Sequence, residues 1–481
     1  MTAAGQPDED GAARPPGHDP AAALPLGSRE GLAPVAVTGE HAAVGLVTGD
    51  LSRAVRRIAL PAVASNVLMT LFASVDTYWV GTRVGSAGLA AVSTSIFWIW
   101  MIVALAEMVG VGLTAVAARR YGERRREEAA RIVGEAVLLA VGLGLLTAIV
   151  GLQAIDWLFA VMRTPPEVTA LGRAYLGTYL LGAPLLYGFF AVDAGFRAAG
   201  DTRTPFVLLA ASVAVTFVLD PVLILGLWGA PRLGIAGAAV ATVGTRCAVF
   251  VMGLALLHRR RLVRFGRPRL APLLAVCRVG LPTALTGSFF SVIYVLLTRT
   301  TTRFGTPALA ALGLGHRVES WLYMVAVGFG AAAAAVVGQN LGAGQVERAR
   351  RAGWLSVGYA MIPATVVFAL MLLVPAPLAG LFTDDPAVVA EAARYLRIAS
   401  VAQLVLCLEV VLEGALGGAG DTVPPMLAST TLTALRLPLA AWSAAQWGVT
   451  GIWWTITLTA VARGLAMALL WRRGGWRHKS L

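Results

Sequence analysis

Long apolar segments limit what this chain can fold into more than any other feature of its sequence. From Leu51 onward, short charged breaks alternate with apolar runs of about 18–30 residues. A helix needs roughly 20 apolar residues to cross the hydrocarbon core of a bilayer. Three of the runs contain no charged residue at all: Ile58–Val75, Ala136–Ile155 and Trp354–Phe382. The pattern therefore predicts a chain that crosses a membrane many times.

Counting the runs and breaks predicts an all-α polytopic membrane protein with twelve transmembrane helices. We expect these helices near residues 58–82, 90–118, 132–158, 168–198, 204–228, 234–257, 271–303, 309–338, 352–380, 390–417, 424–446 and 449–471.

The composition supports a membrane protein and excludes several other classes. Of the 481 residues, 57% are hydrophobic and only 14% are charged, whereas a soluble chain carries roughly a quarter charged residues. The net charge of +13 arises from short basic runs between apolar segments, without the interleaved aromatic residues of a nucleic-acid groove. Cys247, Cys277 and Cys407 lie in apolar stretches and offer no redox or zinc framework.

Basic residues gather in alternate breaks, which predicts how the chain is oriented. One set of breaks holds 24 basic groups and the opposite helix ends hold eight. Because short cytoplasmic loops carry the excess of Lys and Arg, we expect both termini of this multi-pass protein on the cytoplasmic side of the cell membrane. The predicted organisation is a disordered cytoplasmic tail (1–50), an N-terminal six-helix lobe (51–258), a basic cytoplasmic linker (259–270), a C-terminal six-helix lobe (271–472) and a second cytoplasmic tail (473–481).

The two halves of the chain repeat each other. Leu60-Pro61 matches Leu281-Pro282 at a shift of 221 residues, and Ala199–Thr202 matches Ala419–Thr422 at a shift of 220. The nearly constant shift indicates that a unit of six helices was duplicated. Because six is even, the copies run parallel and are related by an axis along the membrane normal. Two similar bundles that face each other across a cleft are typical of alternating access.

Short motifs occur in these repeats in a specific order and spacing. They are Leu60-Pro61 with Asp76, Val80 and Gly81, then Gly200–Thr202 with Thr204-Pro205, Leu219–Pro221, Gly234–Ala239 with Ala241-Thr242, and Gly338–Gly344. Through these motifs, residues 55–470 resemble the multidrug and toxic compound extrusion (MATE) family of cation-coupled transporters, and most closely its DNA-damage-inducible protein F branch. The resemblance implies an antiporter that exports organic, often cationic, drugs in exchange for protons or sodium, with its coupling carboxylates in the N-terminal half.

Two aspartates lie where a charge is costly. Asp76 follows 18 uncharged residues, and Asp220 ends the apolar run Phe206–Leu219. A carboxylate at the bilayer centre costs about 2.5–3.5 kcal/mol, so a proton, a bound cation or a hydrogen-bonded partner must compensate it. At the shifts that align the halves, these positions become Leu297 and Ala440. The sequence thus predicts a one-sided ionic site in the first lobe, although Asp76 at a helix end that reaches water is the alternative.

The family resemblance implies helper residues for this site on the fifth and sixth helices. Thr242 matches one helper, whereas Thr216 stands where the family commonly has Asn. A threonine offers one hydroxyl oxygen rather than a carbonyl and an amide, which favours protons over a sodium ion at Asp76 and Asp220. No other metal and no cofactor is expected, and the coupling ion stays open between H⁺ and Na⁺.

Pro61 lies fifteen residues before Asp76 and cannot donate the helical hydrogen bond to the preceding turn. We therefore expect a hinge in the first helix. The alternative is that proline is simply common in membrane helices.

Four charged residues occupy matching positions in the two halves. Asp193 and Glu413 each lie seven residues before the glycine of a Gly-Asp-Thr motif, which favours a structural role or a gate at the inner mouth. Arg246 and Arg463 match at a shift of 217, and we expect them to form architectural salt bridges or to bind carbonyl groups.

Other residues are candidates for the substrate cleft. An Arg-x-Glu pair, Arg317 and Glu319, is too costly to face lipid, so it either lines the cleft or forms a local pair. Trp98 and Trp321 lie too deep in their helices for an interfacial belt. They either bind flat cations or pack between helices.

No enzymatic constellation accompanies these features, because the sequence has no metal cluster, phosphate-binding loop or nucleophile pair. We expect a monomer whose partners are a small organic substrate and the lipid bilayer, not nucleic acid. A flippase for lipid-linked saccharides is the alternative within transport, with Arg278, Arg317 and Arg436 as the free arginines available for a diphosphate. The alternative to a transporter is a membrane scaffold or channel, in which Asp76 and Asp220 are dispensable.

Overall fold

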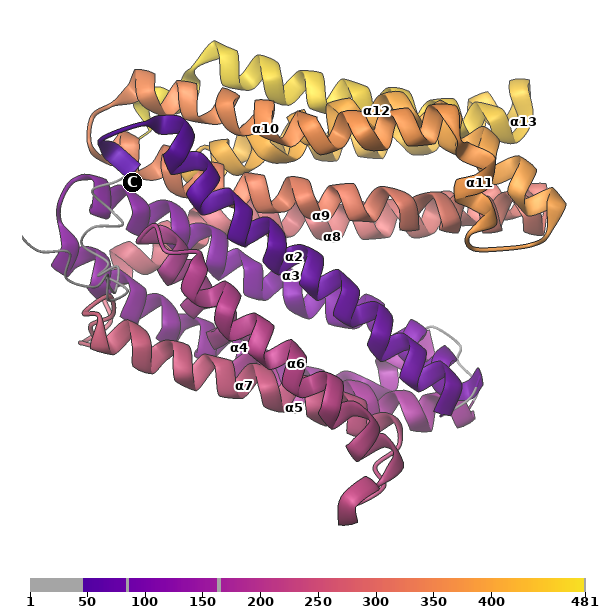
Figure 1. The fold of residues 1–481 in the computed structure, drawn as a ribbon, viewed down its shortest axis with the longest axis horizontal. Helices are drawn as coiled ribbons and strands as arrows, with labels where there is room; N and C mark the ends of the chain where they lie inside the picture. Colours follow the sequence, from indigo (N-terminus) through magenta and orange to yellow (C-terminus); the bar gives the residue numbers. More distant parts are fainter. Residues whose placement is uncertain (1–45, 84–85, 162–165, 480–481) are drawn as a thin grey trace, which may run out of the picture. The chain divides into compact units, whose positions relative to one another are not determined.

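The computed structural model describes residues 46–83, 86–161 and 166–479, and helices make up nearly all of them (Figure 1). The long helices are α2 (Leu51–Arg83), α3 (Ser86–Gly122), α4 (Arg126–Val161), α5 (Pro166–Ala198), α6 (Arg203–Leu225), α7 (Ile235–Arg259), α8 (Leu270–Thr301), α9 (Thr306–Gly342), α10 (Val346–Leu373), α12 (Pro386–Gly418) and α13 (Val423–Arg473).

These eleven helices are long and apolar enough to cross a membrane, within the ranges described. Helix α13 supplies two spans, because its backbone leaves the helical conformation at Trp447 and Gly448, where Gly448 has φ 61°. The fold class and the twelve predicted spans are therefore confirmed. One predicted range was wrong: the helix expected over 352–380 ends at Leu373, and a short helix α11 (Pro375–Gly380) follows. The reason is Pro375, which disfavours helical backbone at the residue before it.

The first helix of each repeat packs across to the other repeat. Helix α2 contacts α9 and α6, and its counterpart α8 contacts α3 and α13 (Figure 1). The buried core of α3, α4, α5 and α7 accordingly includes Val276 and Ala284 of α8. The core of α9, α10 and α12 includes Val55 and Ile58 of α2. By sequence order, each of these two helices belongs to one repeat. In the packed structure, each contacts helices of both repeats.

Glycines allow α3 and α9 to approach closely. A side chain at Gly122 would collide with the carbonyl oxygen of Gln339, and a side chain at Gly342 would collide with the carbonyl oxygen of Arg119. Small residues at membrane helix contacts permit such backbone approach and the van der Waals packing that follows from it. The two glycines thus bring the C-terminal ends of the second helices of the two repeats together.

The repeated Gly-Asp-Thr motif forms the same turn twice. Gly200 and Gly420 have φ values of 85° and 80°, a left-handed conformation that favours glycine. Asp201 accepts hydrogen bonds from the backbone N–H groups of Arg203 and Thr204, both at 3.1 Å, which stabilises the start of α6.

Each aspartate of this turn also holds a cation that lies beyond the last helix of its own repeat. The guanidinium of Arg260 is 2.6 Å from Asp201, and the ammonium of Lys479 is 3.1 Å from Asp421. The duplication inferred from the sequence therefore extends to the ion pairs, since each repeat has a matching aspartate–cation pair.

Both ends of the described chain meet the basic loops. Asn340 donates a hydrogen bond to the carbonyl of Leu46 at 3.2 Å, and Arg348 donates to the carbonyl of Gly49 at 3.0 Å. Arg119 donates to the carbonyl of Lys479 at 2.6 Å. Leu46 is only 2% exposed although it lies inside the predicted tail 1–50; residues 1–45 lie outside the described residues.

Candidate functional site

Of the two predicted coupling carboxylates, Asp220 is the one whose side chain the structure describes. It lies near the end of α6, and its exposed fraction is 0%. Pro221 follows it within the helix and has no N–H group, so the usual hydrogen bond to the preceding turn is missing there. A carboxylate with no access to solvent, on a helix that crosses the membrane, is the costly arrangement that the sequence indicated.

A cluster of hydroxyl groups lies one turn before Asp220, where α6 packs against α7. The Thr216 hydroxyl is 2.8 Å from the carbonyl oxygen of Ser212 and 2.7 Å from the hydroxyl of Thr245. Thr245 was missed by the sequence reasoning, although it follows Thr242 by three residues on the same face of α7. The Thr242 hydroxyl is buried and has no hydrogen-bond partner among the described residues. The cluster therefore joins α6 to α7 and keeps one hydroxyl available.

Asp76 lies within α2, but its side chain lies outside the described residues. The contact between α2 and α6 places the two helices that carry Asp76 and Asp220 side by side. The pairing of the two carboxylates stays a prediction.

Pro61 lies inside α2, which continues as a helix from Leu51 to Arg83. Its ring leaves the carbonyl of Arg57 without the usual helical donor. Ser65 donates to the carbonyl of Pro61 at 3.0 Å, which holds the next turn. The proline is therefore a local weakness in an otherwise continuous helix, and its role as a hinge stays a prediction.

The repeated acids Asp193 and Glu413 are both half-buried. Asp193 forms an ion pair with Arg197 at 2.9 Å and also interacts electrostatically with Arg246. Glu413 interacts with Glu409 and Arg463. The structural role and the gating role of the repeated acids both stay predictions.

Arg463 forms the architectural salt bridge expected of it. Its guanidinium is 3.4 Å from the carboxylate of Glu409, is 3.3 Å from the hydroxyl of Thr433, and lies over the ring of Phe290 with 5.6 Å to the centroid. The sequence reasoning did not single out Glu409, because the matching position of the first repeat is Phe189 and carries no acid.

Charged groups from both repeats act on Tyr323 of α9. The tyrosine is 44% exposed and interacts electrostatically with the carboxylates of Glu107 of α3 and of Glu409 and Glu413 of α12, and with the guanidinium of Arg463 of α13. Glu107 is itself exposed. An exposed aromatic ring with carboxylates among the charges that act on it is a candidate position for an organic cation.

The aromatic cleft candidates differ in their surroundings. Trp321 is 41% exposed. Trp98 is half-buried and packs against the core of the N-terminal lobe, which agrees with the packing alternative.

Glu319 is held by neighbours within the C-terminal repeat. Its carboxylate accepts hydrogen bonds from the Tyr395 hydroxyl at 3.1 Å and from the Gln403 amide at 3.0 Å, and it lies 3.1 Å from Nδ1 of His316. Arg317 is exposed and forms no ion pair with Glu319 in the described structure, so the local-pair alternative was wrong. Two of the partners come from α12, about 80 residues away, and no local motif could indicate them.

The C-terminal repeat has a different charge at the position that matches this site. Residue 216 corresponds to Arg436 at the shift of 220, and the side chain of Arg436 is 2% exposed. Its Nε donates to the hydroxyl of Thr459 at 2.9 Å. Ala440, which corresponds to Asp220, is buried and uncharged. The two lobes therefore differ at both positions: the first has Thr216 and an acid at 220, and the second has a base at 436 and Ala440.

The fold and this site define a polytopic membrane protein built from two six-helix repeats. The MatE family model matches residues 61–222 and 282–442, one stretch in each repeat. The chain belongs to the MatE family, which confirms the resemblance; the branch within the family stays a prediction.

Individual relatives match over nearly the whole chain. The multidrug resistance protein NorM of Burkholderia vietnamiensis is 30% identical over 429 residues, covering 86% of this chain and 92% of the relative. A FAD transporter of Shewanella oneidensis is 27% identical, covering 89% and 96%. A solved outward-facing conformation of a multidrug resistance MATE family transporter of the MOP superfamily has a TM-score of 0.84 and 25% identity, covering 91% of this chain and 99% of that one.

Proposed function

We propose that this protein is a secondary active antiporter that exports organic, often cationic, compounds across the cytoplasmic membrane in exchange for protons. One observation carries the proposal: Asp220 is a fully buried carboxylate on a membrane helix, and only one of the two repeats has it. Relatives of the chain are named multidrug resistance proteins, which supports drugs as the exported class.

Protonation is the event by which Asp220 drives the exchange. A low-dielectric surrounding favours the neutral form of a carboxyl group, so Asp220 takes up a proton when its surroundings close and loses it when water enters. Asp76 on the neighbouring helix takes part in the same step. The change of charge alters how α2 packs on α6, while the Thr216–Thr245 contact keeps α6 attached to α7. Helix α2 adjusts by bending at Pro61.

The substrate binds between the repeats, at a position that includes Tyr323. Glu107 and Glu413 contribute negative potential from opposite repeats, which concentrates cationic compounds at this position. The exposed ring of Trp321 is a second aromatic surface on the same helix. Release follows when protonation in the N-terminal lobe shifts the equilibrium between the two facing states.

Protons suit the site better than sodium. The Thr216 oxygen is already engaged with Ser212 and Thr245. Few neutral oxygens therefore remain for an ion that needs a full shell, whereas a carboxyl group binds a proton without one.

The structure gives little support to a flippase for lipid-linked saccharides. A diphosphate needs free arginines in the cleft, but Arg436 is buried and bonded to Thr459. Arg278 and Arg317 are exposed and belong to different helices.

Transport into everted vesicles tests the proposal. We expect a pH gradient to drive uptake of a fluorescent organic cation, and both Asp76→Asn and Asp220→Asn to abolish that uptake at normal folded yield. The matched control is Asp156→Asn, because Asp156 is 65% exposed and forms its ion pair with Arg173 at a helix end. Retained uptake in both variants would refute the coupling assignment and favour a channel or scaffold. If only a sodium gradient drives uptake, the coupling ion is sodium and not the proton.

A further inference from the structure

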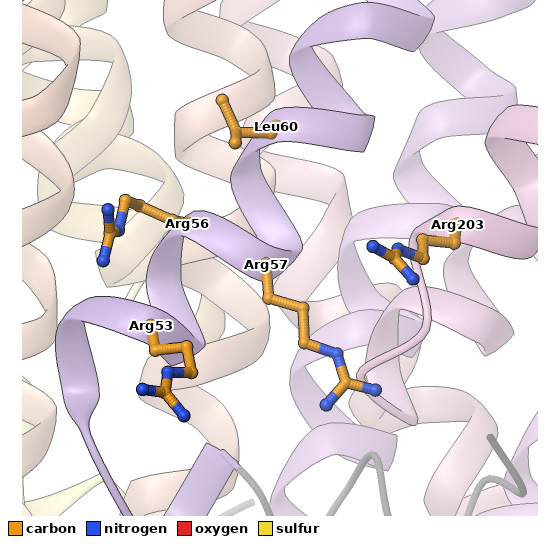
Figure 2. Close-up of a pocket in the computed structure, with 5 residues that line it drawn as sticks. All are labelled: Arg53, Arg56, Arg57, Leu60 and Arg203. Carbon is orange, nitrogen blue, oxygen red and sulfur yellow. The ribbon is translucent and has the colours of Figure 1, made fainter. Parts of the chain in front are cut away.

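An arginine-lined hollow lies where α2 and α6 begin, apart from the coupling site. Its lining residues are Arg53, Arg56, Arg57, Leu60 and Arg203, and its volume is about 340 Å³. Figure 2 shows the three arginines of the first two turns of α2 and Arg203 on the neighbouring helix. Arg57 and Arg203 extend toward each other, whereas Arg56 extends to the other side, where it lies over the ring of Tyr359 with 5.9 Å to the centroid.

No carboxylate compensates these four charges within ion-pair distance in the part of the chain that the structure describes. Some other basic groups at this end of the bundle form ion pairs instead. Arg120 pairs with Glu123, Arg260 with Asp201 and Arg350 with Glu347. Like charges that lie near one another repel, and an anion bound among them would offset this repulsion.

Apolar surface continues from the hollow toward the membrane. Leu60, one turn beyond Arg56 and Arg57, is 61% exposed, and Val207, one turn beyond Arg203, is also 61% exposed. The apolar run of α2 starts at Ile58, which places the arginines at the level of the lipid headgroups. The surface therefore has a cationic head site next to an apolar flank, which fits an amphiphile better than a free anion.

We propose that this hollow binds the phosphate headgroup of an anionic phospholipid, whose acyl chains lie along Leu60 and Val207. Guanidinium groups bind phosphate oxygens through paired hydrogen bonds, and basic pockets between membrane helices are suited to acidic lipid headgroups. The bound lipid joins the first turns of α2 to the start of α6. The proposal depends on the membrane embedding of the chain and not on the proposed exchange reaction.

Native mass spectrometry of the purified full chain in detergent tests this site. The delipidated protein is titrated with dioleoylphosphatidylglycerol, with neutral dioleoylphosphatidylcholine as the comparison lipid. We expect tight binding of the anionic lipid. We also expect at least a tenfold loss of affinity when Arg56, Arg57 and Arg203 are all changed to Gln, since each basic group near an anionic headgroup contributes measurably. The matched control changes the same number of exposed arginines, Arg267, Arg472 and Arg473, to Gln and loses less than about twofold.

Four outcomes would overturn the proposal. Equal losses in the two triple variants would mean that the lipid responds only to the general positive field. Equal binding of the two lipids would exclude headgroup recognition. Displacement of the lipid by equimolar inorganic phosphate would identify a free-anion site instead. Binding that appears only after the six acids of residues 1–45 are changed to amides would assign the hollow to the chain's own acidic segment.

A milder variant keeps the test valid if the triple variant does not fold. Arg203→Gln removes one charge from the α6 side alone, and we expect an intermediate loss of phosphatidylglycerol affinity. An unchanged affinity in this variant, with the fold intact, contradicts a site that spans both helices.

Discussion

Arg463 and Glu409 form an ion pair inside the C-terminal repeat, with side chains only 10% and 6% exposed. Removing one partner of a buried pair leaves an uncompensated charge in a medium that solvates it poorly, which costs about 3–5 kcal/mol. We expect Arg463→Gln to lower the free energy of unfolding by about 3 kcal/mol, measured by titration with SDS in mixed micelles. In this variant the carboxylate of Glu409 loses its ion-pair partner.

The double variant Arg463→Gln with Glu409→Gln is the control for this prediction. It removes both charges, so we expect it to be more stable than Arg463→Gln alone. Equal destabilisation by the single and double variants would mean that Arg463 acts through its contacts with Thr433 and Phe290 instead of through its charge.

At the scale of elements, α2 and α8 are copies that carry different chemistry. Both have a proline at the matching position, but only α2 carries an acid further along, at Asp76. If bending of α2 is part of coupling, Pro61→Ala restores a helical hydrogen bond and stiffens the helix. We expect this change to slow proton-driven uptake in everted vesicles at least severalfold, without loss of folded protein.

Pro282→Ala in α8 is the matched change for this prediction. We expect it to leave uptake nearly unchanged, because the position of Asp76 is occupied by Leu297 in that helix. Equal slowing by both variants would indicate that the prolines serve packing in the two repeats alike.

At the scale of the whole molecule, the described ends of the chain and the basic loops gather at the same end of the bundle. Contacts of Leu46, Gly49 and Lys479 with arginine- and asparagine-bearing helix ends establish this arrangement. Positive loops favour the cytoplasmic side. We expect a green fluorescent protein fused after Leu481 to fluoresce in cells, because this reporter folds in the cytoplasm but not after export in an unfolded form.

Fusion of the same reporter after Arg232 tests the opposite face. This residue lies between α6 and α7, at the other end of these helices, and we expect no fluorescence from it. A bright fusion at Arg232 with a dark one at Leu481 would reverse the orientation.

The residues of the coupling site were only partly predictable. The burial of Asp220 and its absence from the second repeat follow from the apolar run and the repeat shift. Thr245 was not identified as a neighbour of Thr216, and outside the coupling site Glu107 and Glu409 were not identified as groups that act on Tyr323. Their importance depends on contacts between helices, which no periodicity within a single helix reveals.

The sequence by itself determined the helical spans and the duplication. A span needs only a run of about 20 apolar residues, which is a local property of the chain, and the duplication follows from the nearly constant shift between matching motifs. Only the tertiary structure decided that α2 packs on α9 and α8 on α3, that Tyr395 and Gln403 hold Glu319, and that arginines of two helices share one hollow. These arrangements join residues that are far apart along the chain. Helix packing in lipid depends on close fit between surfaces, and that fit exists only once the helices are assembled.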